Sequence, residues 1–259
     1  MYPGEGPTPC DLINGRNPTP HDVAGRRWRA GAPVTGARDG MVMGPFQALV
    51  FDFDYTLADS SRGIVECIRF ALKRLGLPLV SAERARRTIG LSLHDAFVEL
   101  AGNQHATKSD EFARLFIEHA DRVMLDLTIL LDCVPETVAL LKQRGFALGI
   151  LSNKFRYRVM GVLGREHLSR SFGVVVGAED VATLKPAPEG LLMALQRLGS
   201  SPSAALYVGD SLTDAETAAR AGVHFVAVLS GVTPREAFDG YDADAVLADV
   251  SALPDFLGC

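Results

Sequence analysis

The sequence predicts an α/β protein whose parallel sheet is interrupted by an all-helical insert. From Val134 onward, short apolar runs typical of buried strands alternate with amphipathic helical patterns. Strands that alternate with helices in this way form parallel βαβ units. A first apolar strand, at 48–51, is separated from this region by four helical patterns in succession, so it must join the same sheet across the insert.

The first strand ends in two carboxylates. Residues 48–51 read Ala-Leu-Val-Phe, a continuous apolar run expected of a strand buried on both faces, and Asp52 and Asp54 follow it. Residues two apart in extended chain point the same way, so both acids can face the carboxyl edge of the sheet, where ligands bind. Adjacent carboxylates repel unless a cation joins them or one is protonated, which favours Mg²⁺. Alternatively, Asp54 is a turn residue that caps the next segment.

The insert is predicted to consist of four helices. Residues 63–75 are amphipathic and end at Gly-Leu-Pro; Ser81 is suited to N-cap a short helix through about Thr88. Two further helices are expected at 93–101 and 110–126. The apolar positions expected in the interior are Ile64, Ile68, Leu72, Phe97, Leu100, Phe112, Phe116 and Ile117.

Beyond the insert, strands and helices alternate to the end of the chain. Strands are expected at 146–151, 174–176, 205–208 and 223–229. Helices are expected at 135–144, 155–164, 188–198 and 213–221, and short elements at 234–238, 245–247 and 251–257.

The strand at 146–151 is followed by Ser152-Asn153-Lys154. A hydroxyl followed by free backbone N–H groups at a helix start can hold an anion. The alternative is that Ser152 is simply the N-cap of the next helix; both roles can hold together.

Lys185 begins the stretch Lys-Pro-Ala-Pro, and prolines on either side restrict the backbone around a single ammonium group. A solvated loop lysine is the alternative.

Asp210 follows the strand at 205–208, with Asp214 one helical turn further on. Asp214 can either lie beside Asp210 or serve only as an acidic residue at a helix N-terminus.

Composition narrows the function classes. The formal charge of −5 and a pI of about 5.7 argue against nucleic acid as a partner. Four scattered cysteines form neither a zinc motif nor a disulfide framework and favour a reducing compartment, so we expect a cytoplasmic protein. No apolar run approaches the roughly 20 residues that span a membrane.

Residues 1–44 differ from the rest of the chain. They hold six of the 14 prolines and show no helical or strand period, so a disordered or loosely attached extension is expected. A transit peptide, or translation that begins at Met41 or Met43, are the alternatives.

Together, the motif Asp52-Phe-Asp54-Tyr-Thr56-Leu-Ala-Asp-Ser, the hydroxyl at Ser152, the Lys-Pro-Ala-Pro stretch and Asp210 resemble the haloacid dehalogenase-like (HAD) superfamily. The branch is that of phosphoglycolate phosphatase and β-phosphoglucomutase. The resemblance covers about residues 46 to 250 and departs at Tyr55, where the family usually has glycine. It implies a Rossmann-like core at 45–60 and 132–259, with a small helical cap at 61–131.

The resemblance also implies a chemistry. Asp52 would be the nucleophile that becomes phosphorylated, Asp54 the general acid and base, and Lys185 the neutralising cation. Mg²⁺ would be held by Asp52, the backbone carbonyl of Asp54, Asp210 and Asp214. The family assigns substrate contacts to positions matched by Thr56, Ser152, Asn153 and Lys185, and Arg87 in the cap loop could meet a carboxylate or second phosphate.

The expected activity is hydrolysis of a small, phosphoglycolate-like phosphate monoester by a monomer or homodimer. The second acid, Asp54, argues for phosphate chemistry, because family dehalogenases lack it. A phosphomutase of the β-phosphoglucomutase type, a pyrophosphatase, and a non-catalytic binding protein on the same scaffold stay open as alternatives. For Arg87, an exposed arginine at a helix end is the structural alternative.

Overall fold

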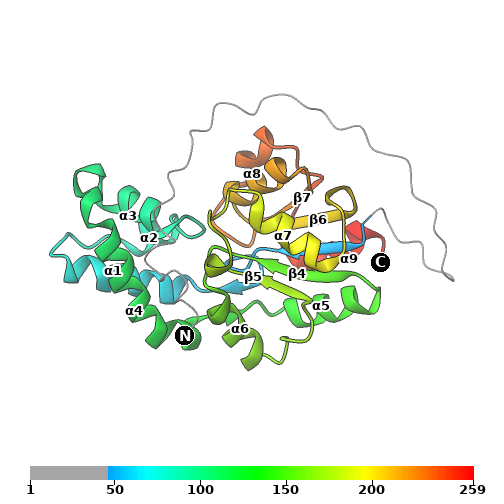
Figure 1. Cartoon of the computed structure of the whole chain (residues 1–259), viewed down its shortest axis with the longest axis horizontal. Coiled ribbons are helices and arrows are strands. Elements are labelled where there is room, and N and C mark those ends of the chain that lie inside the picture. The colour runs from blue at the N-terminus through cyan, green and yellow to red at the C-terminus, as the bar shows by residue number, and fades with distance from the viewer. Residues whose placement is uncertain (1–45) are drawn as a thin grey trace, which may run out of the picture.

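The computed structural model describes residues 46–259, so the extension at 1–44 lies outside the described residues. The described chain has two parts, a sheet flanked by helices and a separate group of helices at one end of it (Figure 1). We call residues 61–127 of this group, from α1 to α4, the helical unit. No helix in residues 46–259 has the length and apolar character needed to cross a membrane.

The main sheet has six strands in the order β5-β4-β1-β6-β7-β8, and every neighbouring pair is parallel. This confirms the predicted parallel sheet. The strands are β1 (Ala48–Phe51), β4 (Ala147–Leu151), β5 (Val174–Val176), β6 (Ala205–Gly209), β7 (His224–Val228) and β8 (Ala245–Leu247).

Strand β1 lies at the centre of the sheet, and its register positions the site. Phe51 lies opposite Ile150 of β4 and Val208 of β6. The chain segments that leave these three strands therefore emerge side by side at one edge, because the strands are parallel. Asp52, Ser152 and Asp210 are all within two residues of that point.

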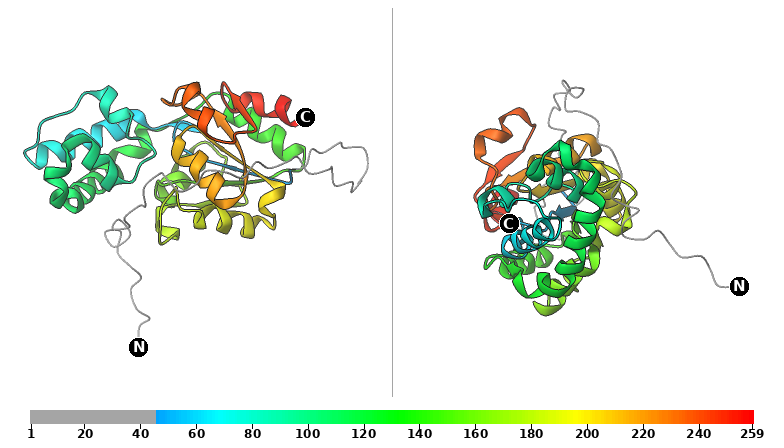
Figure 2. Two further views of the ribbon diagram at one scale, coloured as in Figure 1. Left: turned by 90° about the horizontal axis from the view of Figure 1, so that it is seen from above. Right: turned by 90° about the vertical axis from the view of Figure 1, so that its left-hand side faces the viewer.

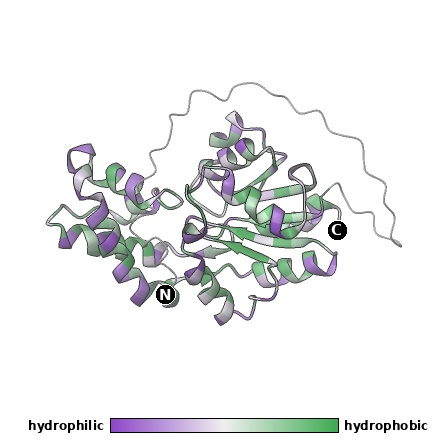
Figure 3. Ribbon diagram, in the orientation of Figure 1, coloured by the Kyte–Doolittle hydropathy of each residue, from purple (hydrophilic) through white to green (hydrophobic). Residues whose placement is uncertain are grey.

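Helices cover both faces of the sheet (Figure 2). Leu49 and Phe51 pack on one face with residues from α5, α6 and α9, and Ala48 and Val50 pack on the other with residues from α7 and α8. This alternation follows from the period of two in a strand, and the strands are apolar along their length (Figure 3). The helices are α5 (Val134–Gln143), α6 (Arg156–Arg165), α7 (Glu189–Leu198), α8 (Leu212–Ala221) and α9 (Leu253–Leu257). Short 3-10 turns lie at Ala178–Asp180, Pro202–Ala204, Arg235–Gly240 and Val250–Ala252.

The helical unit has its own hydrophobic core, separate from the two cores of the sheet. Its members are α1 (Ser61–Arg74), α2 (Ala82–Arg86), α3 (Leu93–Ala101) and α4 (Ser109–Leu127), with a 3-10 turn at Asn103–Lys108. Six of the eight predicted interior residues are buried there, and Ile64 and Ile117 are partly buried against them. Helices α1 and α4 approach so closely that a Cβ on Gly63 would lie 2.9 Å from the sulfur of Met124.

One element was not predicted. Strands β2 (Ala58–Asp59) and β3 (Ile129–Leu130) form an antiparallel pair where the chain leaves for the helical unit and returns from it. Two-residue strands are too short to show a hydrophobic period, so the sequence pattern could not reveal them.

The separate core of the helical unit leads to a stability prediction. Phe112 is fully buried, and its ring packs on Phe97 with centroids 4.8 Å apart. Phe112→Ala should lower the free energy of unfolding of the helical unit by about 3 to 5 kcal/mol. Amide hydrogen exchange should show the loss of protection concentrated in residues 61–127, with the strands of the sheet affected less.

The matched control is Leu192→Ala on α7, where the side chain is exposed. It should change stability by less than about 0.5 kcal/mol. Equal loss of protection in the sheet and in the helical unit of Phe112→Ala would contradict the division into separate cores.

Candidate active site

Three buried carboxylates meet at the carboxyl edge of the sheet. Asp52 follows β1, Asp210 follows β6, and Asp214 lies in the first turn of α8. One oxygen from each lies within 4.8 Å of the others. The predicted convergence of these three residues is therefore present in the structure.

Lys185 inserts its ammonium group among these acids. Its Nζ donates to Oδ1 of Asp52 at 2.6 Å, to Oδ1 of Asp214 at 2.7 Å and to the hydroxyl of Tyr207 at 3.1 Å. An ammonium group has three N–H donors, and each has a partner here. The lysine side chain is only 3% exposed, so the alternative of a solvated loop residue is wrong.

Burial and charge together set the protonation of this cluster. Burial raises the pKa of Asp52 to about 7, although the nearby Lys185 charge opposes the rise. Burial and the charges of Asp214 and Asp52 raise the pKa of Asp210 well above its usual range. For Lys185, burial lowers the pKa, but the charges of Asp214 and Asp52 outweigh burial and raise it. The cluster thus holds a permanent cation and still favours further positive charge.

Tyr207 is a member of this network that was not predicted from the sequence. Its hydroxyl donates to Oδ1 of Asp214 at 2.8 Å and accepts from Lys185, and the residue is fully buried within β6. A buried tyrosine usually finds a polar partner. The signal was a tyrosine in the apolar run Ala-Leu-Tyr-Val that leads to Asp210.

Asp214 fills both roles that the sequence left open. It forms a capping box with Ser211 at the start of α8, in which each residue bonds the backbone N–H of the other. Its other oxygen accepts from Lys185 and Tyr207. The carboxylate therefore links the helix start to the buried ammonium group.

Asp54 takes a different position from Asp52. Its side chain does not join the cluster of three carboxylates, and its Oδ1 lies 3.2 Å from Nζ of Lys154. The contact is an ion pair without hydrogen-bond geometry, so Oδ1 is a buried oxygen with no hydrogen bond to the described residues. Both acids still line one cavity, as predicted from their spacing. Thr56, two residues after Asp54, contacts the carboxylate cluster, because its hydroxyl lies 3.4 Å from Oδ1 of Asp210.

Two backbone features hold the loop that follows β1. Tyr55 adopts φ of 61°, the left-handed conformation that explains the usual glycine at this position. Its carbonyl accepts from the hydroxyl of Ser230 at 2.5 Å, in the segment after β7. In that segment a Cβ on Gly231 would lie 1.9 Å from Oδ2 of Asp210, so any larger residue there would displace the Asp210 carboxylate.

The prediction that Ser152 N-caps the next helix is wrong. Helix α6 begins at Arg156 with Phe155 as its N-cap, and Ser152 Oγ instead accepts from the backbone N–H of Lys154 at 3.2 Å. The expected free N–H groups at the helix start are also not free. The N–H groups of Arg156 and Tyr157 donate to the carboxylate of Glu179 at 2.7 and 3.2 Å. A side chain of the protein thus occupies the anion cradle.

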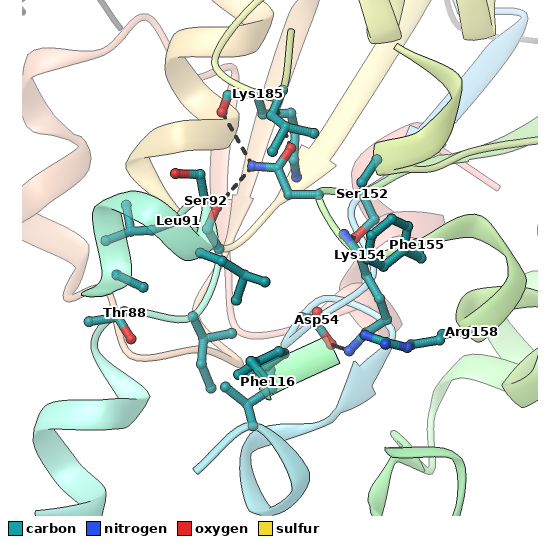
Figure 4. Close-up of a pocket in the computed structure, with 18 of the residues that line it drawn as sticks. Asp54, Thr88, Leu91, Ser92, Phe116, Ser152, Lys154, Phe155, Arg158 and Lys185 are labelled. Atoms are coloured by element: carbon teal, nitrogen blue, oxygen red, sulfur yellow. Dashed lines mark hydrogen bonds and ion pairs between the residues drawn. The ribbon is translucent and has the colours of Figure 1, made fainter. Parts of the chain in front are cut away.

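Asn153 joins three segments through its amide. Its oxygen accepts from the N–H of Lys185 at 2.9 Å, and its nitrogen lies 3.2 Å from the carbonyl oxygens of Lys185 and Gly90. The amide therefore fixes the backbone at Lys185 and links it to the loop that follows α2 of the helical unit. Figure 4 draws the two contacts of the amide nitrogen as dashed lines below the Lys185 label.

The cavity lies between the sheet edge and the helical unit and has a volume of about 100 Å³. Its polar wall comes from the core, with Asp52, Asp54, Ser152, Asn153, Lys154, Arg158 and Lys185. Its apolar wall comes largely from α1, α4 and the loop at 88–92. The part of the cap loop that directly follows Arg87 therefore lines the cavity.

Arg87 itself does not line the cavity. Its guanidinium pairs with Glu83 one turn earlier in α2, and the side chain is 69% exposed. The structure therefore places Arg87 at an exposed helix end, apart from the other predicted residues. The cationic residue that sequence analysis missed is Arg158, which lines the cavity from α6.

The donor set fits a divalent cation. Asp52, Asp210 and Asp214 are three carboxylates, and Lys185 is the ammonium group paired with two of them. Two negative charges stay uncompensated when all three acids are ionised. Oxygen donors of this kind suit a hard cation such as Mg²⁺ or Ca²⁺.

The contacts of Lys185 predict a large stability effect. Lys185→Met removes the ammonium group and leaves Asp52 and Asp214 buried without a counter-charge. The expected cost is about 3 to 5 kcal/mol of unfolding free energy, measured by denaturant titration. The double variant Lys185→Met with Asp214→Asn should recover part of this loss.

The matched control is Arg87→Met, which breaks an exposed ion pair. Its expected cost is at most about 0.5 kcal/mol. A cost for Lys185→Met as small as that of the control would contradict the described network.

Comparison with known proteins gives the family. Residues 49–228 match the family model of haloacid dehalogenase-like hydrolases. The chain is 30% identical over 233 residues to proteins named phosphoglycolate phosphatase from Escherichia coli strain K12 and Salmonella typhimurium strain LT2, covering 82% of this chain and 92% of each relative.

Solved structures that resemble this chain come from the same family as these relatives. A crystal structure described as a haloacid dehalogenase-like hydrolase from Bacteroides fragilis has a TM-score of 0.78 and 41% identity, covering 80% of this chain and 99% of that one. A predicted phosphoglycolate phosphatase from Haemophilus somnus 129pt has a TM-score of 0.73 and 25% identity, covering 83% and 99%. These matches confirm the Rossmann-like α/β fold. The chain belongs to the haloacid dehalogenase-like hydrolase family.

Proposed function

We propose that this protein is a Mg²⁺-dependent phosphatase that hydrolyses a small phosphate monoester through a phosphorylated Asp52. The observation that supports this most is the buried contact of Asp52 with Lys185, beside Asp210 and at the open edge of the sheet. The relatives named phosphoglycolate phosphatase support the same class of reaction. Phosphoglycolate is therefore the first substrate to test.

In the first step, an oxygen of Asp52 attacks phosphorus while the bond from phosphorus to the alcohol oxygen breaks. Asp54 donates a proton to the departing alcohol. Lys185 remains charged throughout, because its carboxylate neighbours raise its pKa. It therefore offsets the negative charge of both the nucleophile and the phosphoryl oxygens.

In the second step, Asp54 takes a proton from water, which attacks the phosphorus of the aspartyl phosphate. Inorganic phosphate leaves and the Asp52 carboxylate is restored. Dividing the reaction through a covalent intermediate replaces one difficult step by two easier ones. Ser152 and Asn153, which line the cavity, and Thr56, whose hydroxyl lies beside Asp210, would contact the phosphoryl group.

Asp52, Asp210 and Asp214 would hold the Mg²⁺ ion, together with the backbone carbonyl of Asp54. When bound, the ion supplies positive charge that neutralises the phosphoryl oxygens. The protein residues alone leave negative charge in this cluster, and the raised pKa values of Asp52 and Asp210 reflect the cost of burying it.

We further infer that residues 61–131 act as a cap over a core formed by 45–60 and 132–259. The loop at 88–92 lines the cavity, and Gly90 is bonded to Asn153 of the core. Movement of the helical unit would break this bond and open the cavity to solvent. Closure would exclude water during the first step.

Because Asp52 and Asp54 have different proposed roles, their substitution should reduce phosphatase activity in different ways. Asp52→Asn should abolish release of inorganic phosphate from every ester. Asp54→Asn should lower kcat/KM for an alkyl phosphate by about 10²- to 10⁴-fold. The loss for 4-nitrophenyl phosphate should be smaller, because nitrophenolate departs without a proton.

Three outcomes would count against the proposal. Equal losses on both esters in Asp54→Asn would contradict its role as an acid. Isomerisation of sugar phosphates with little phosphate release would favour a phosphomutase. Full activity of Asp52→Asn would exclude the covalent route.

Metal binding predicts a thermal shift. Saturating Mg²⁺, at about 100 times its dissociation constant, should stabilise the protein by about 2.7 kcal/mol relative to EDTA. This corresponds to a rise in Tm of about 5 to 10 °C. Asp210→Asn should lose this rise while unfolding in EDTA at or above the wild-type temperature, because it removes a buried charge.

The matched control is Asp126→Asn, at an exposed position on α4. This variant should keep the full rise in Tm. A wild-type Tm that is the same in Mg²⁺ and EDTA would contradict the metal site.

A further inference from the structure

We propose that Arg158, beside Lys154, binds an anionic group on the leaving-group side of the substrate and so determines specificity. The group would be a carboxylate or a second phosphate. This inference rests on the proposed phosphatase function, since it concerns the same cavity. It assigns to Arg158 a role that the sequence analysis gave to Arg87.

Arg158 is placed where the leaving group must lie. The phosphoryl group belongs beside Asp52 and Lys185, and the leaving oxygen belongs beside Asp54. Asp54 pairs with Lys154, and Lys154 and Arg158 lie on the same side of the cavity, opposite Thr88 and Leu91 (Figure 4). The side of the cavity beyond Asp54 is therefore the cationic one.

The guanidinium of Arg158 has donors to spare. Its Nε and Nη2 bond Oδ1 of Asp121, at 3.0 and 2.6 Å, and Nη2 also bonds the carbonyl of Ile117 at 3.0 Å. Its Nη1 donates to no other residue within 46–259. An arginine has five N–H donors in a planar fork, and its side chain here is only 8% exposed. A buried guanidinium at a cavity whose Nη1 is unused is suited to a carboxylate or phosphate oxygen.

The rest of the cavity wall offers few other positive charges to a substrate, so Arg158 would determine which leaving groups bind. Residues of the described helical unit contribute no lysine or arginine to the wall, which on that side includes Ile64, Ile68, Phe116 and Met124. Lys185 is fully engaged by Asp52, Asp214 and Tyr207. Among the cationic residues that line the cavity within 46–259, Arg158 and Lys154 are therefore those left to meet a charged leaving group. An apolar wall strengthens such a charge pair, because it lowers the local dielectric.

The position of the guanidinium is fixed before any substrate arrives. It lies 5.2 Å from the ring centre of Phe155 and 5.4 Å from that of Tyr157. Asp121 of α4 holds it through one oxygen only, and the Asp121 side chain is 47% exposed. The contacts with Asp121 and Ile117 use Nε and Nη2 and leave Nη1 without a partner among residues 46–259. Asp121 neutralises Arg158 in this arrangement without contacting Nη1.

A purely structural role is the competing explanation, because the Arg158–Asp121 pair also joins the core to the helical unit. The two roles differ in substrate dependence. A tether would affect all substrates alike, whereas an anion-binding residue would affect only those with a charged leaving group.

The test compares kcat/KM for phosphoglycolate and inorganic pyrophosphate, each divided by kcat/KM for ethyl phosphate. In Arg158→Met, at least one of these ratios should fall by about 10- to 100-fold, the size expected for a lost charged hydrogen bond. The affected ratio identifies a carboxylate or a phosphate as the anion. Arg158→Lys should retain part of the ratio, since the charge is kept and the fork is lost.

Asp121→Asn is the matched control. It removes the charge of the pair with the helical unit but keeps the guanidinium, which Ile117, Phe155 and Tyr157 still position, so neither ratio should fall. Ratios that stay at the wild-type value in Arg158→Met, or that fall equally in Asp121→Asn, would overturn the inference in favour of a tether.

A binding measurement separates this inference from the proposed function. Calorimetry with Asp52→Asn, in Mg²⁺, should show weaker phosphoglycolate or pyrophosphate binding when Arg158→Met is added, and a smaller change for ethyl phosphate. Suppose that wild-type protein binds phosphoglycolate or pyrophosphate more tightly than ethyl phosphate but releases no inorganic phosphate. This result would refute the phosphatase function and leave the Arg158 inference standing. Selectivity for binding that does not depend on Arg158 would refute the inference.

Discussion

The buried ammonium group of Lys185 is the contact on which the site depends. It neutralises Asp52 and Asp214, which come from distant parts of the chain and could not share a dry space without it. The amide of Asn153 holds the Lys185 backbone, and Tyr207 takes the third donor. This network stabilises the protein and, in the proposed reaction, keeps a positive charge beside the nucleophile.

Much of this arrangement follows from the sequence, because parallel strands place their carboxyl ends at one edge. Strand β1 was recognisable as an apolar run, and so were the acids that follow it. The same rule placed Asp210 beyond β6 and led to the expected meeting with Asp52, which the structure contains. Residues on neighbouring strand ends can be predicted without knowing how side chains pack.

The features of the site that could not be predicted depend on contacts between distant segments, and such contacts leave no local pattern in the sequence. Arg87 lies near the cavity loop in sequence, but its direction is set by α2, and it pairs with Glu83 in solvent. The backbone N–H groups at the start of α6 were expected to be free, yet they donate to the carboxylate of Glu179 from another segment. Arg158 enters the cavity only because α6 packs beside α4 of the helical unit. Such contacts require the relative placement of elements, which periodicity does not give.

The central claim is that Asp52 carries the phosphoryl group between the two steps. The most direct measurement is to quench the protein during turnover of phosphoglycolate in Mg²⁺ and reduce the acyl phosphate with borohydride. Peptide mass spectrometry then locates the modified residue. We expect homoserine at position 52 and nowhere else. An unmodified Asp52 during rapid phosphate release, or modification of another carboxylate, would contradict it.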